Sequence, residues 1–468
     1  MEMASKPLPP RTDAGNAEGF AAKYGDLLRF DHSHRRWLYW SGERWEEDTL
    51  EGVLLLAKSA ARHRLELVAK CMKDDEKDFK AEVAWCIESE QRHRIRAALD
   101  LARAERPLST SGEEFDKDQW LLGVENGVVD LRTGNLREAR REDWITRSTR
   151  FPFDERAGCP RFEQFLCEIF EYDRELIEFV WRAIGYSLTG SVNEQCFFAC
   201  HGSGANGKSK LLGTLHYVLG DYALNLPFST FELKQRSAIP NDLVRLESRR
   251  YVTALESAEG VQLNEQRIKT LTGGDPITAR LLYKEFVTFD PTHKLWLAFN
   301  HKPIITDDTP AIWRRVRLIP FNHKFEGQED DKDLLEKLKA EASGILASAV
   351  RACLEWQQGG LGTPRAVAEA TSEYQEESDQ VAAFLGEVCT VEECKAAPCS
   401  DLFSRYVKWT EQSGENPMTR MAFSERLEGK GFRKKRRGHE NVWVWLGIGL
   451  LGTPVEPCEL RLGDSMRL

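Results

Sequence analysis

Apolar and polar residues alternate with different periods along the chain, and the changes of period divide it into regions. Residues 35–48 (RRWLYWSGERWEED) alternate as a strand pair does around a turn. Helical spacing follows in residues 50–72 and again in the stretch ending near 105. Residues 121–139 (LLGVENGVVDLRTGNLREA) predict short strands joined by turns, because Asn-Gly and Thr-Gly pairs interrupt apolar runs. Amphipathic helices are predicted within residues 162–190.

The second half of the chain begins with a region typical of a parallel sheet. Strand and helix patterns alternate from residue 196 to about 322. Residues 332–361 are helical and could form a lid over a ligand. From about 380 to 450 the pattern is three helices followed by a strand pair. The first twenty or so residues carry Pro, Gly and charged residues with little periodicity, so disorder is expected there.

Composition favours a soluble globular protein with several domains. The 468 residues are 41% hydrophobic and 30% charged. No run approaches the roughly 18 apolar residues that span a bilayer, and the N-terminus lacks the apolar core of a signal peptide. Eleven scattered cysteines indicate reduced thiols rather than a disulfide framework. These features predict a protein of the cytoplasm, with a bacterial host cytosol expected, and no membrane partner.

The decapeptide HGSGANGKSK (201–210) fits the pattern G-x-x-x-x-G-K-[ST] of a phosphate-binding loop, between an apolar run and a helix-like segment. Gly202, Gly204 and Gly207 are expected to let the backbone adopt positive φ and approach a ligand closely, so that successive N–H groups point at one anion. The following helix N-terminus adds partial positive charge. Lys208 is expected to reach the β- and γ-phosphates, and the Ser209 hydroxyl to ligate Mg²⁺. The predicted ATP-binding residues are Gly202, Ser203, Gly204, Ala205, Asn206, Gly207, Lys208, Ser209 and Lys210.

Two later strands end in polar residues suited to phosphate chemistry. One apolar strand ends at Glu256, where an acid could hold Mg²⁺ and orient the attacking water. An acidic strand end without chemistry is an equally frequent alternative, which the spacing of roughly 50 residues after the P-loop disfavours. Residues 294–300 (KLWLAFN) end in Asn300, which could contact the γ-phosphate and the water from a strand next to the P-loop strand.

Two basic features could serve as partners for phosphates. Arg314 and Arg315 precede an apolar run, and an arginine that projects into a neighbour's nucleotide site stabilises transition-state charge. Surface arginine pairs are more often only solvated. The run Arg433, Lys434, Lys435, Arg436 and Arg437 lies in the C-terminal strand pair, a pattern that suits the wing of a winged helix on DNA. A nuclear-import signal and a solvated surface run are the alternatives. The net charge of −10 does not by itself indicate nucleic-acid binding.

The order of P-loop, acid-ended strand, Asn-ended strand and arginine pair resembles a superfamily 3 helicase domain of the AAA+ class. Residues 271–321 are similar to the helicase part of phage and plasmid primases related to the poxvirus primase-helicase. NGVVDLRTGNL (126–136) matches the segment that precedes the helicase in that family, and the C-terminal region resembles its closing domain. The resemblance covers most of residues 30–450.

The resemblance implies a role for each candidate residue. Lys208 and Ser209 are the P-loop residues, Glu256 is the Walker B acid that also holds Mg²⁺, and Asn300 is the sensor. Arg314, with Arg315 as the alternative, is the trans-acting finger. Residues 277–289 are similar to the hairpin that such helicases point into a ring channel, with DNA contacts expected at Arg280, Tyr283 and Lys284. No room is expected for an appended polymerase-type primase domain, so primase activity is not predicted.

The predicted fold is α/β: an AAA+ P-loop NTPase core with an α+β N-terminal region, a helical lid and a C-terminal winged helix. The expected boundaries are 1–25 (disordered), 26–185, 186–325 (core), 326–379 (lid), 380–450 (winged helix) and 451–468 (tail). The predicted function is an ATP-dependent replicative DNA helicase of a phage, plasmid or integrated mobile element. It is expected to form a homo-hexamer, act on single-stranded and forked DNA, and cooperate with a separate primase or other replication protein. The alternative is a nucleotide-switched initiator or loader that binds origin DNA without processive unwinding.

Overall fold

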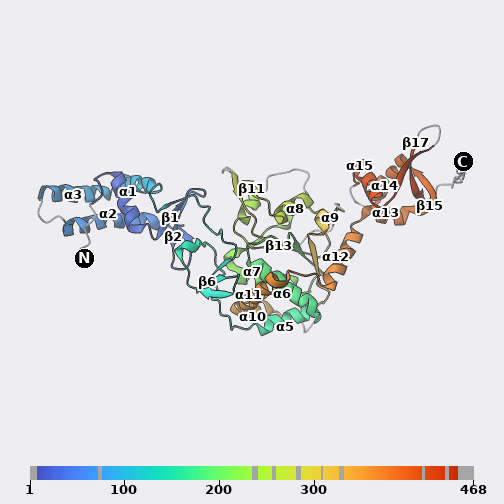
Figure 1. Ribbon diagram of the computed structural model, residues 1–468, viewed down its shortest axis with the longest axis horizontal. Helices are drawn as coiled ribbons and strands as arrows, with labels where there is room; N and C mark the ends of the chain where they lie inside the picture. The colour runs from blue at the N-terminus through green and yellow to red at the C-terminus, as the bar shows by residue number, and fades with distance from the viewer. Residues whose placement is uncertain are drawn as a thin grey trace, which may run out of the picture.

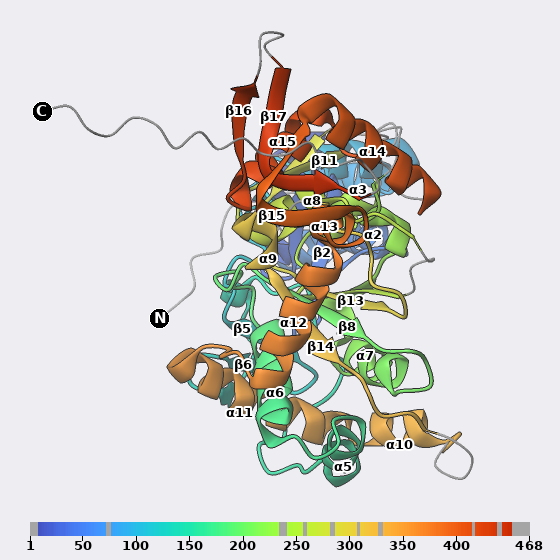
Figure 2. The same ribbon diagram turned by 90° about the vertical axis from the view of Figure 1, so that its right-hand side faces the viewer.

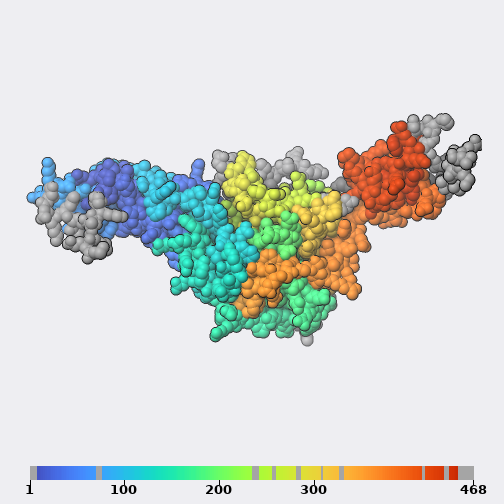
Figure 3. Space-filling view, viewed as in Figure 1, coloured from blue at the N-terminus to red at the C-terminus, as the bar shows by residue number. Residues whose placement is uncertain are grey.

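The structure is a computed structural model that describes residues 8–71, 76–233, 241–255, 260–280, 286–306, 309–325, 331–413, 417–437 and 442–451. The molecule is elongated, with an N-terminal module, a central α/β body and a small C-terminal module following one another along its length (Figures 1 and 3). Among the described residues, no helix is both long enough and apolar enough to cross a membrane.

The N-terminal module packs helices beside a four-stranded sheet of order β3-β2-β1-β4. Its strands are β1 (Leu28–Asp31), β2 (Arg36–Trp40), β3 (Trp45–Glu47) and β4 (Ser109–Thr110), and its helices are α1 (Asp13–Tyr24), α2 (Gly52–Cys71), α3 (Glu76–Ser89) and α4 (Arg92–Ala102). The predicted strand pair in residues 35–48 is confirmed as the antiparallel pair β2–β3. The helices predicted in residues 50–72 and in the stretch ending near 105 also form, as α2 to α4.

The expected disorder of residues 1–25 is wrong for the part that the structure describes, because α1 occupies Asp13–Tyr24. The Thr12 side chain accepts a hydrogen bond from the Gly15 N–H and caps this helix. Ala17, Phe20 and Tyr24 are buried in one cluster with residues of α2 and α4. Small residues make much of this buried face, so the polar and glycine-rich sequence conceals a packed helix.

A three-stranded antiparallel sheet connects this module to the central body. It contains β5 (Leu121–Val124), β6 (Gly127–Asp130) and β7 (Asn135–Arg137), which confirms the strands predicted in residues 121–139. Short 3-10 turns occupy Arg141–Asp143, Gly220–Tyr222, Phe228–Thr230 and Asn241–Leu246.

A five-stranded parallel sheet forms the centre of the body, which confirms the parallel sheet predicted from residue 196. The strand order is β14-β8-β13-β10-β9, with bounds β8 Phe197–His201, β9 Ala223–Asn225, β10 Tyr251–Leu255, β13 Lys294–Phe299 and β14 Val316–Pro320. Every pairing in this sheet is parallel. All five strands therefore end at the same edge of the sheet.

Helices cover both faces of this sheet. The core on one face includes residues of α5 (Pro160–Ile169), α6 (Arg174–Leu188), α7 (Lys208–Leu219), α10 (Leu334–Ala340) and α11 (Ala342–Gly359). The core on the other face includes residues of α8 (Glu265–Gly273), α9 (Pro310–Trp313) and α12 (Arg365–Glu377). Because α5 and α6 share a core with α7, the packing unit begins before α5 rather than at the expected boundary near 185.

An antiparallel hairpin of β11 (Ile277–Arg280) and β12 (Phe286–Phe289) stands beside the body, as residues 277–289 predict. Tyr283 and Lys284, expected at its tip, lie outside the described residues. Figures 1 and 2 show α12 leading from the body to the C-terminal module.

The C-terminal module contains the predicted three helices and strand pair, together with a strand that the pattern did not predict. Its elements are α13 (Gln380–Val388), β15 (Cys389–Pro398), α14 (Cys399–Gln412), α15 (Arg420–Gly429), β16 (Arg433–Arg437) and β17 (Val442–Leu450). The sheet order is β15-β17-β16. Strand β15 is exposed over residues 391–394 and has an irregular register between Val391 and Ala396, so its sequence lacks strand alternation.

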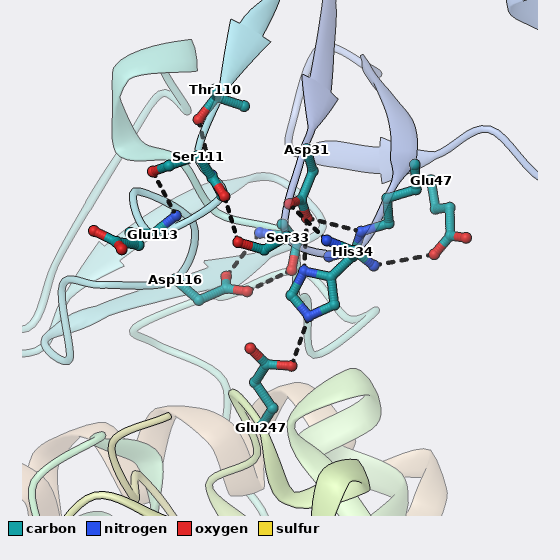
Figure 4. A network of polar contacts seen from close by, with 12 residues as sticks. Asp31, Ser33, His34, Glu47, Thr110, Ser111, Glu113, Asp116 and Glu247 are labelled. Atoms are coloured by element: carbon teal, nitrogen blue, oxygen red, sulfur yellow. Dashed lines mark hydrogen bonds and ion pairs between the residues drawn. The ribbon is translucent and has the colours of Figure 1, made fainter. Parts of the chain in front are cut away.

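A polar network joins the N-terminal module to the central body (Figure 4). The His34 ring contacts Asp31 through Nδ1 (2.8 Å) and Glu247 of the body through Nε2 (2.9 Å). The Arg36 Nε also donates to Asp31, at 3.2 Å. Hydrogen bonds to the two carboxylates raise the pKa of His34 to about 9, so the ring is a cation between two anions at neutral pH.

Candidate nucleotide-binding site

The P-loop joins the carboxyl end of β8 to the start of α7, which is the strand–loop–helix context that a phosphate site requires. Gly207 caps α7 with φ +84°, a left-handed conformation that favours glycine. The N-terminus of this 12-residue helix presents free N–H groups and partial positive charge to the loop. The loop is therefore built to receive an anion.

Gly202 is required for space rather than for a left-handed conformation. A Cβ atom at this position would lie 2.1 Å from the Asn206 amide nitrogen and 2.3 Å from the Phe321 carbonyl oxygen. The Asn206 Nδ2 donates to that same carbonyl at 3.2 Å. Any larger residue at 202 would displace this contact, which holds the P-loop against the segment after β14.

Lys208 is buried, with 5% of its surface exposed, and among the described residues its ammonium hydrogen-bonds to uncharged oxygens. Nζ donates to the carbonyl of Gly202, and to Oδ1 of Asn206 and Oδ1 of Asn300, both at 3.1 Å. Burial lowers the pKa of Lys208. Within the residues that the structure describes, no carboxylate pairs with this cation. A buried cation without a counter-charge fits a site for phosphate oxygens.

Asn300 directly follows β13, the strand that pairs with β8, in a register that sets Phe299 opposite His201. This adjacency, which the sequence predicts, brings the Asn300 amide to the Lys208 ammonium. A γ-phosphate held by Lys208 would lie beside a polar group that can also position water.

A pocket opens above these residues at the carboxyl edge of the sheet, where open α/β sheets bind their ligands. Leu255, Ala298, Phe299 and Asn300 line it from the strands, and Phe165 from α5. Phe325, Asp331 and Leu334 close it from the segment leading into α10. The P-loop contributes Gly204, Ala205, Asn206, Gly207, Lys208, Ser209 and Lys210.

Three predicted residues stand differently toward this pocket. Gly202, which is buried, and Ser203, which is exposed, are not among the lining residues. Glu256, the predicted Walker B acid, lies outside the described residues, while Leu255 at the end of β10 lines the pocket. Ser209 and Asp331 are oxygen-bearing residues of the lining, the ligand type that Mg²⁺ prefers.

The two candidate finger arginines have opposite environments. Both precede β14, at the amino edge of the sheet, because Val316 pairs in parallel with Phe197 at the start of β8. Arg314 is exposed, and its Nη2 donates to Gln195 Oε1 at 3.1 Å. Arg315 is buried, and its Nε donates to Thr272 Oγ1 at 3.2 Å. Of the two, Arg314 has the guanidinium that a neighbouring molecule can reach.

The candidate DNA-binding residues that are described lie on two surfaces. On the hairpin, Arg280 is exposed and its guanidinium lies 5.2 Å from the ring of Phe286, which is 56% exposed. Phe286 has an exposed aromatic face of the kind that can stack on bases, and sequence reasoning missed it. The available signal was an aromatic residue, Phe286, that the predicted hairpin sets opposite Arg280.

The basic run forms β16, at the edge of the C-terminal sheet. Lys434 pairs with Glu428 at 2.8 Å and lies over Trp445, and Arg436 lies over Trp443. Arg433 and Lys435 are exposed, and Arg437 ends the strand. The surface therefore combines cations with a half-exposed tryptophan.

Comparisons with known proteins support one family. Residues 17–171 match the family described as D5 N terminal like, and residues 376–444 match the one described as Poxvirus D5 protein-like. The chain is 30% identical over 320 residues to "Putative helicase L207/L206" of Acanthamoeba polyphaga mimivirus, covering 63% of this chain and 33% of that protein. It is 28% identical over 235 residues to "Putative primase C962R" of African swine fever virus, covering 48% and 24%.

The chain spans a third or less of the length of these two relatives. In fold it is similar to the apo structure of the NrS-1 C terminal region, with a TM-score of 0.51 and 10% identity over 94% of this chain and 100% of that one. The family matches and the viral relatives support a primase-helicase family related to the poxvirus D5 protein, which confirms the resemblance found in the sequence.

Proposed function

We propose that this protein is an ATP-driven DNA helicase that assembles as a ring, a hexamer by the family resemblance, and translocates on single-stranded DNA. Its replicon would be a phage, a plasmid or an integrated mobile element. The observation that carries the proposal is the buried Lys208 ammonium, hydrogen-bonded to Asn300 in a pocket at the carboxyl edge of a parallel sheet. The names of the viral relatives support a helicase in general.

The P-loop favours a nucleoside triphosphate because it combines a helix N-terminus with a buried ammonium that pairs with no carboxylate among the described residues. Bound Mg²⁺ would neutralise charge on the β- and γ-phosphates, held by the Ser209 hydroxyl and by Glu256. Asn300 would orient the attacking water from its place beside Lys208. The sheet order, which sets the Asn300 strand between the P-loop strand and the strand that leads to Glu256, supports an AAA+ core.

A ring is favoured because the arginine lies on the wrong side of the sheet to serve its own nucleotide. Arg314 precedes β14 at the amino edge, whereas the P-loop follows β8 at the carboxyl edge. A five-residue strand spans about 16 Å between these edges. Arg314 is exposed and would complete the site of the adjacent subunit, where it stabilises transition-state charge.

DNA would contact two surfaces. The hairpin would meet single strands in the channel through Arg280, Phe286 and, at the tip, Tyr283 and Lys284. The C-terminal module, proposed as a winged helix, would bind backbone phosphates through Arg433, Lys435 and their neighbours.

The test measures ATP hydrolysis and displacement of a labelled strand from forked DNA by the purified protein, with Lys208→Ala as the control. The proposal expects hydrolysis stimulated by single-stranded DNA and ATP-dependent displacement, both lost in the variant. Tight binding to specific duplex DNA, with hydrolysis indifferent to single strands and no displacement, would instead indicate the initiator or loader. Absence of hydrolysis in the wild-type protein would contradict both.

A further inference from the structure

We propose that Gln195 is a positioning residue that holds Arg314 in place and ties it to the root of the β11–β12 hairpin. The inference rests on the proposed function, because it assigns to Gln195 the means by which DNA on the hairpin controls the arginine that completes a neighbour's site.

The Gln195 amide uses both of its polar atoms. Oε1 accepts a hydrogen bond from Arg314 Nη2 at 3.1 Å, and Nε2 donates to the Gly273 carbonyl at 3.0 Å. Gly273 is the last residue of α8, and β11 begins only four residues later, at Ile277. One side chain therefore connects the exposed arginine to the start of the hairpin.

The backbone around Gln195 is held in an uncommon conformation. Its φ is +47°, which is left-handed and rare for a residue with a long side chain. Its N–H donates to the Val192 carbonyl at 3.0 Å, and the preceding Glu194 accepts from Trp356 Nε1 of α11 at 2.7 Å. Such a conformation persists only where surrounding contacts fix it. The loop before β8 is thus a defined support for the amide.

The adjacent arginine contacts the same end of α8. Arg315 Nε donates to Thr272 Oγ1, one residue before Gly273. Arg315 is buried and anchors the backbone, whereas the Arg314 guanidinium is exposed and depends on Gln195 for its orientation. Movement of the hairpin root would shift the Gly273 carbonyl, turn the Gln195 amide and change where Arg314 points.

Two substitutions separate the two hydrogen bonds. Gln195→Ala removes both, and kcat is expected to fall about tenfold to a hundredfold because the arginine is misplaced, with KM for ATP unchanged. In Gln195→Glu the carboxylate still accepts from Arg314 but cannot donate to the Gly273 carbonyl. This variant should lose less basal activity than Gln195→Ala and should lose most of the stimulation by single-stranded DNA. Asn193→Ala, which changes an exposed amide in the same loop, should behave as wild type.

A mixing experiment distinguishes positioning from general damage. Gln195→Ala subunits keep an intact P-loop, so mixed with Lys208→Ala subunits they should recover hydrolysis as Arg314→Ala subunits do. Melting temperatures are measured alongside to check folding. If wild type shows DNA-stimulated hydrolysis and both Gln195 variants match it, the inference is overturned and the proposed function stands. Loss of activity that mixing does not restore, in folded protein, also overturns it. A wild-type protein without ATPase activity would overturn the proposed function itself.

Discussion

The two edges of the central sheet carry the two halves of the proposed active site, and they are built differently. At the carboxyl edge Lys208 is buried and donates to three oxygens, two of them on Asn206 and Asn300. At the amino edge Arg314 is exposed and has one amide contact to Gln195. The first edge is organised within one chain, whereas in the proposed function the second becomes part of a site only when another subunit docks. Substitutions at the two edges should therefore impair the protein in different ways.

The largest expected effect is at the carboxyl edge. Lys208→Ala should abolish hydrolysis, because the β- and γ-phosphates lose the lysine that the P-loop provides. Steady-state phosphate release measures this, with melting temperature as the folding control. Retention of more than about a tenth of wild-type turnover would remove this P-loop from the mechanism.

At the amino edge, substitution of Arg314 should lower turnover, whereas substitution of Arg315 should lower stability. Arg314→Ala should lower kcat by about 1000-fold with little change in melting temperature, since its side chain is exposed and, in the proposed ring, acts on a neighbour. Arg315→Ala should instead destabilise the fold by about 1–3 kcal/mol, because it leaves the buried Thr272 hydroxyl without this donor. Turnover and urea unfolding of each variant check the contrast. The reverse pattern would make Arg315 the finger.

The C-terminal module should affect DNA binding without altering either edge. Replacing Arg433, Lys434, Lys435, Arg436 and Arg437 with neutral residues should weaken DNA binding and flatten its salt dependence, by about one unit of slope for each DNA phosphate that is no longer neutralised. Lys434→Gln alone should matter least, because its ammonium is already paired with Glu428. Fluorescence anisotropy over a salt series gives the slopes. An unchanged slope would make this run a solvated surface.

The smallest effect is expected at His34. Its ring contacts Asp31 of the N-terminal module and Glu247 of the body, both in the same chain. Because the folded-state pKa is raised from 6.5 to about 9, the charged ring contributes stability that is fully present below about pH 6.5 and is lost as pH rises through 9. His34→Gln should therefore be less stable than wild type at pH 6.5, and the gap should close by about pH 10. Thermal melting across this range measures it; a gap independent of pH would mean that the charge is not what stabilises the contact.

Much of the candidate nucleotide pocket could be predicted because its residues are close together in the sequence. The P-loop occupies ten consecutive residues, and the apolar strand 294–300 ends in a polar amide that the parallel sheet brings to Lys208. Because parallel strands end at one edge of the sheet, residues that follow different strands in the sequence meet there in one site. The role of Gly202 differs from the one predicted, because the pattern alone cannot distinguish a need for space from a need for left-handed φ.

Other features depend on packing that a sequence pattern does not carry. Helix α1 buries alanine and glycine as well as Phe20, so its apolar face looks weak in the sequence. The contact between Gln195 and Arg314 spans 119 residues and exists only because the loop before β8 meets the loop before β14. The difference between Arg314 and Arg315 is likewise one of burial, which adjacency in sequence conceals.

The most direct test of the shared active site mixes two inactive proteins. Arg314→Ala subunits keep the P-loop, and Lys208→Ala subunits keep the arginine, so mixed assemblies contain interfaces with both. We predict that each variant alone is nearly inactive and that their mixture recovers hydrolysis, with the recovery depending on the mixing ratio. No recovery, although subunit exchange is demonstrated by fluorescence energy transfer between labelled chains, would contradict the proposal that Arg314 completes a neighbour's site.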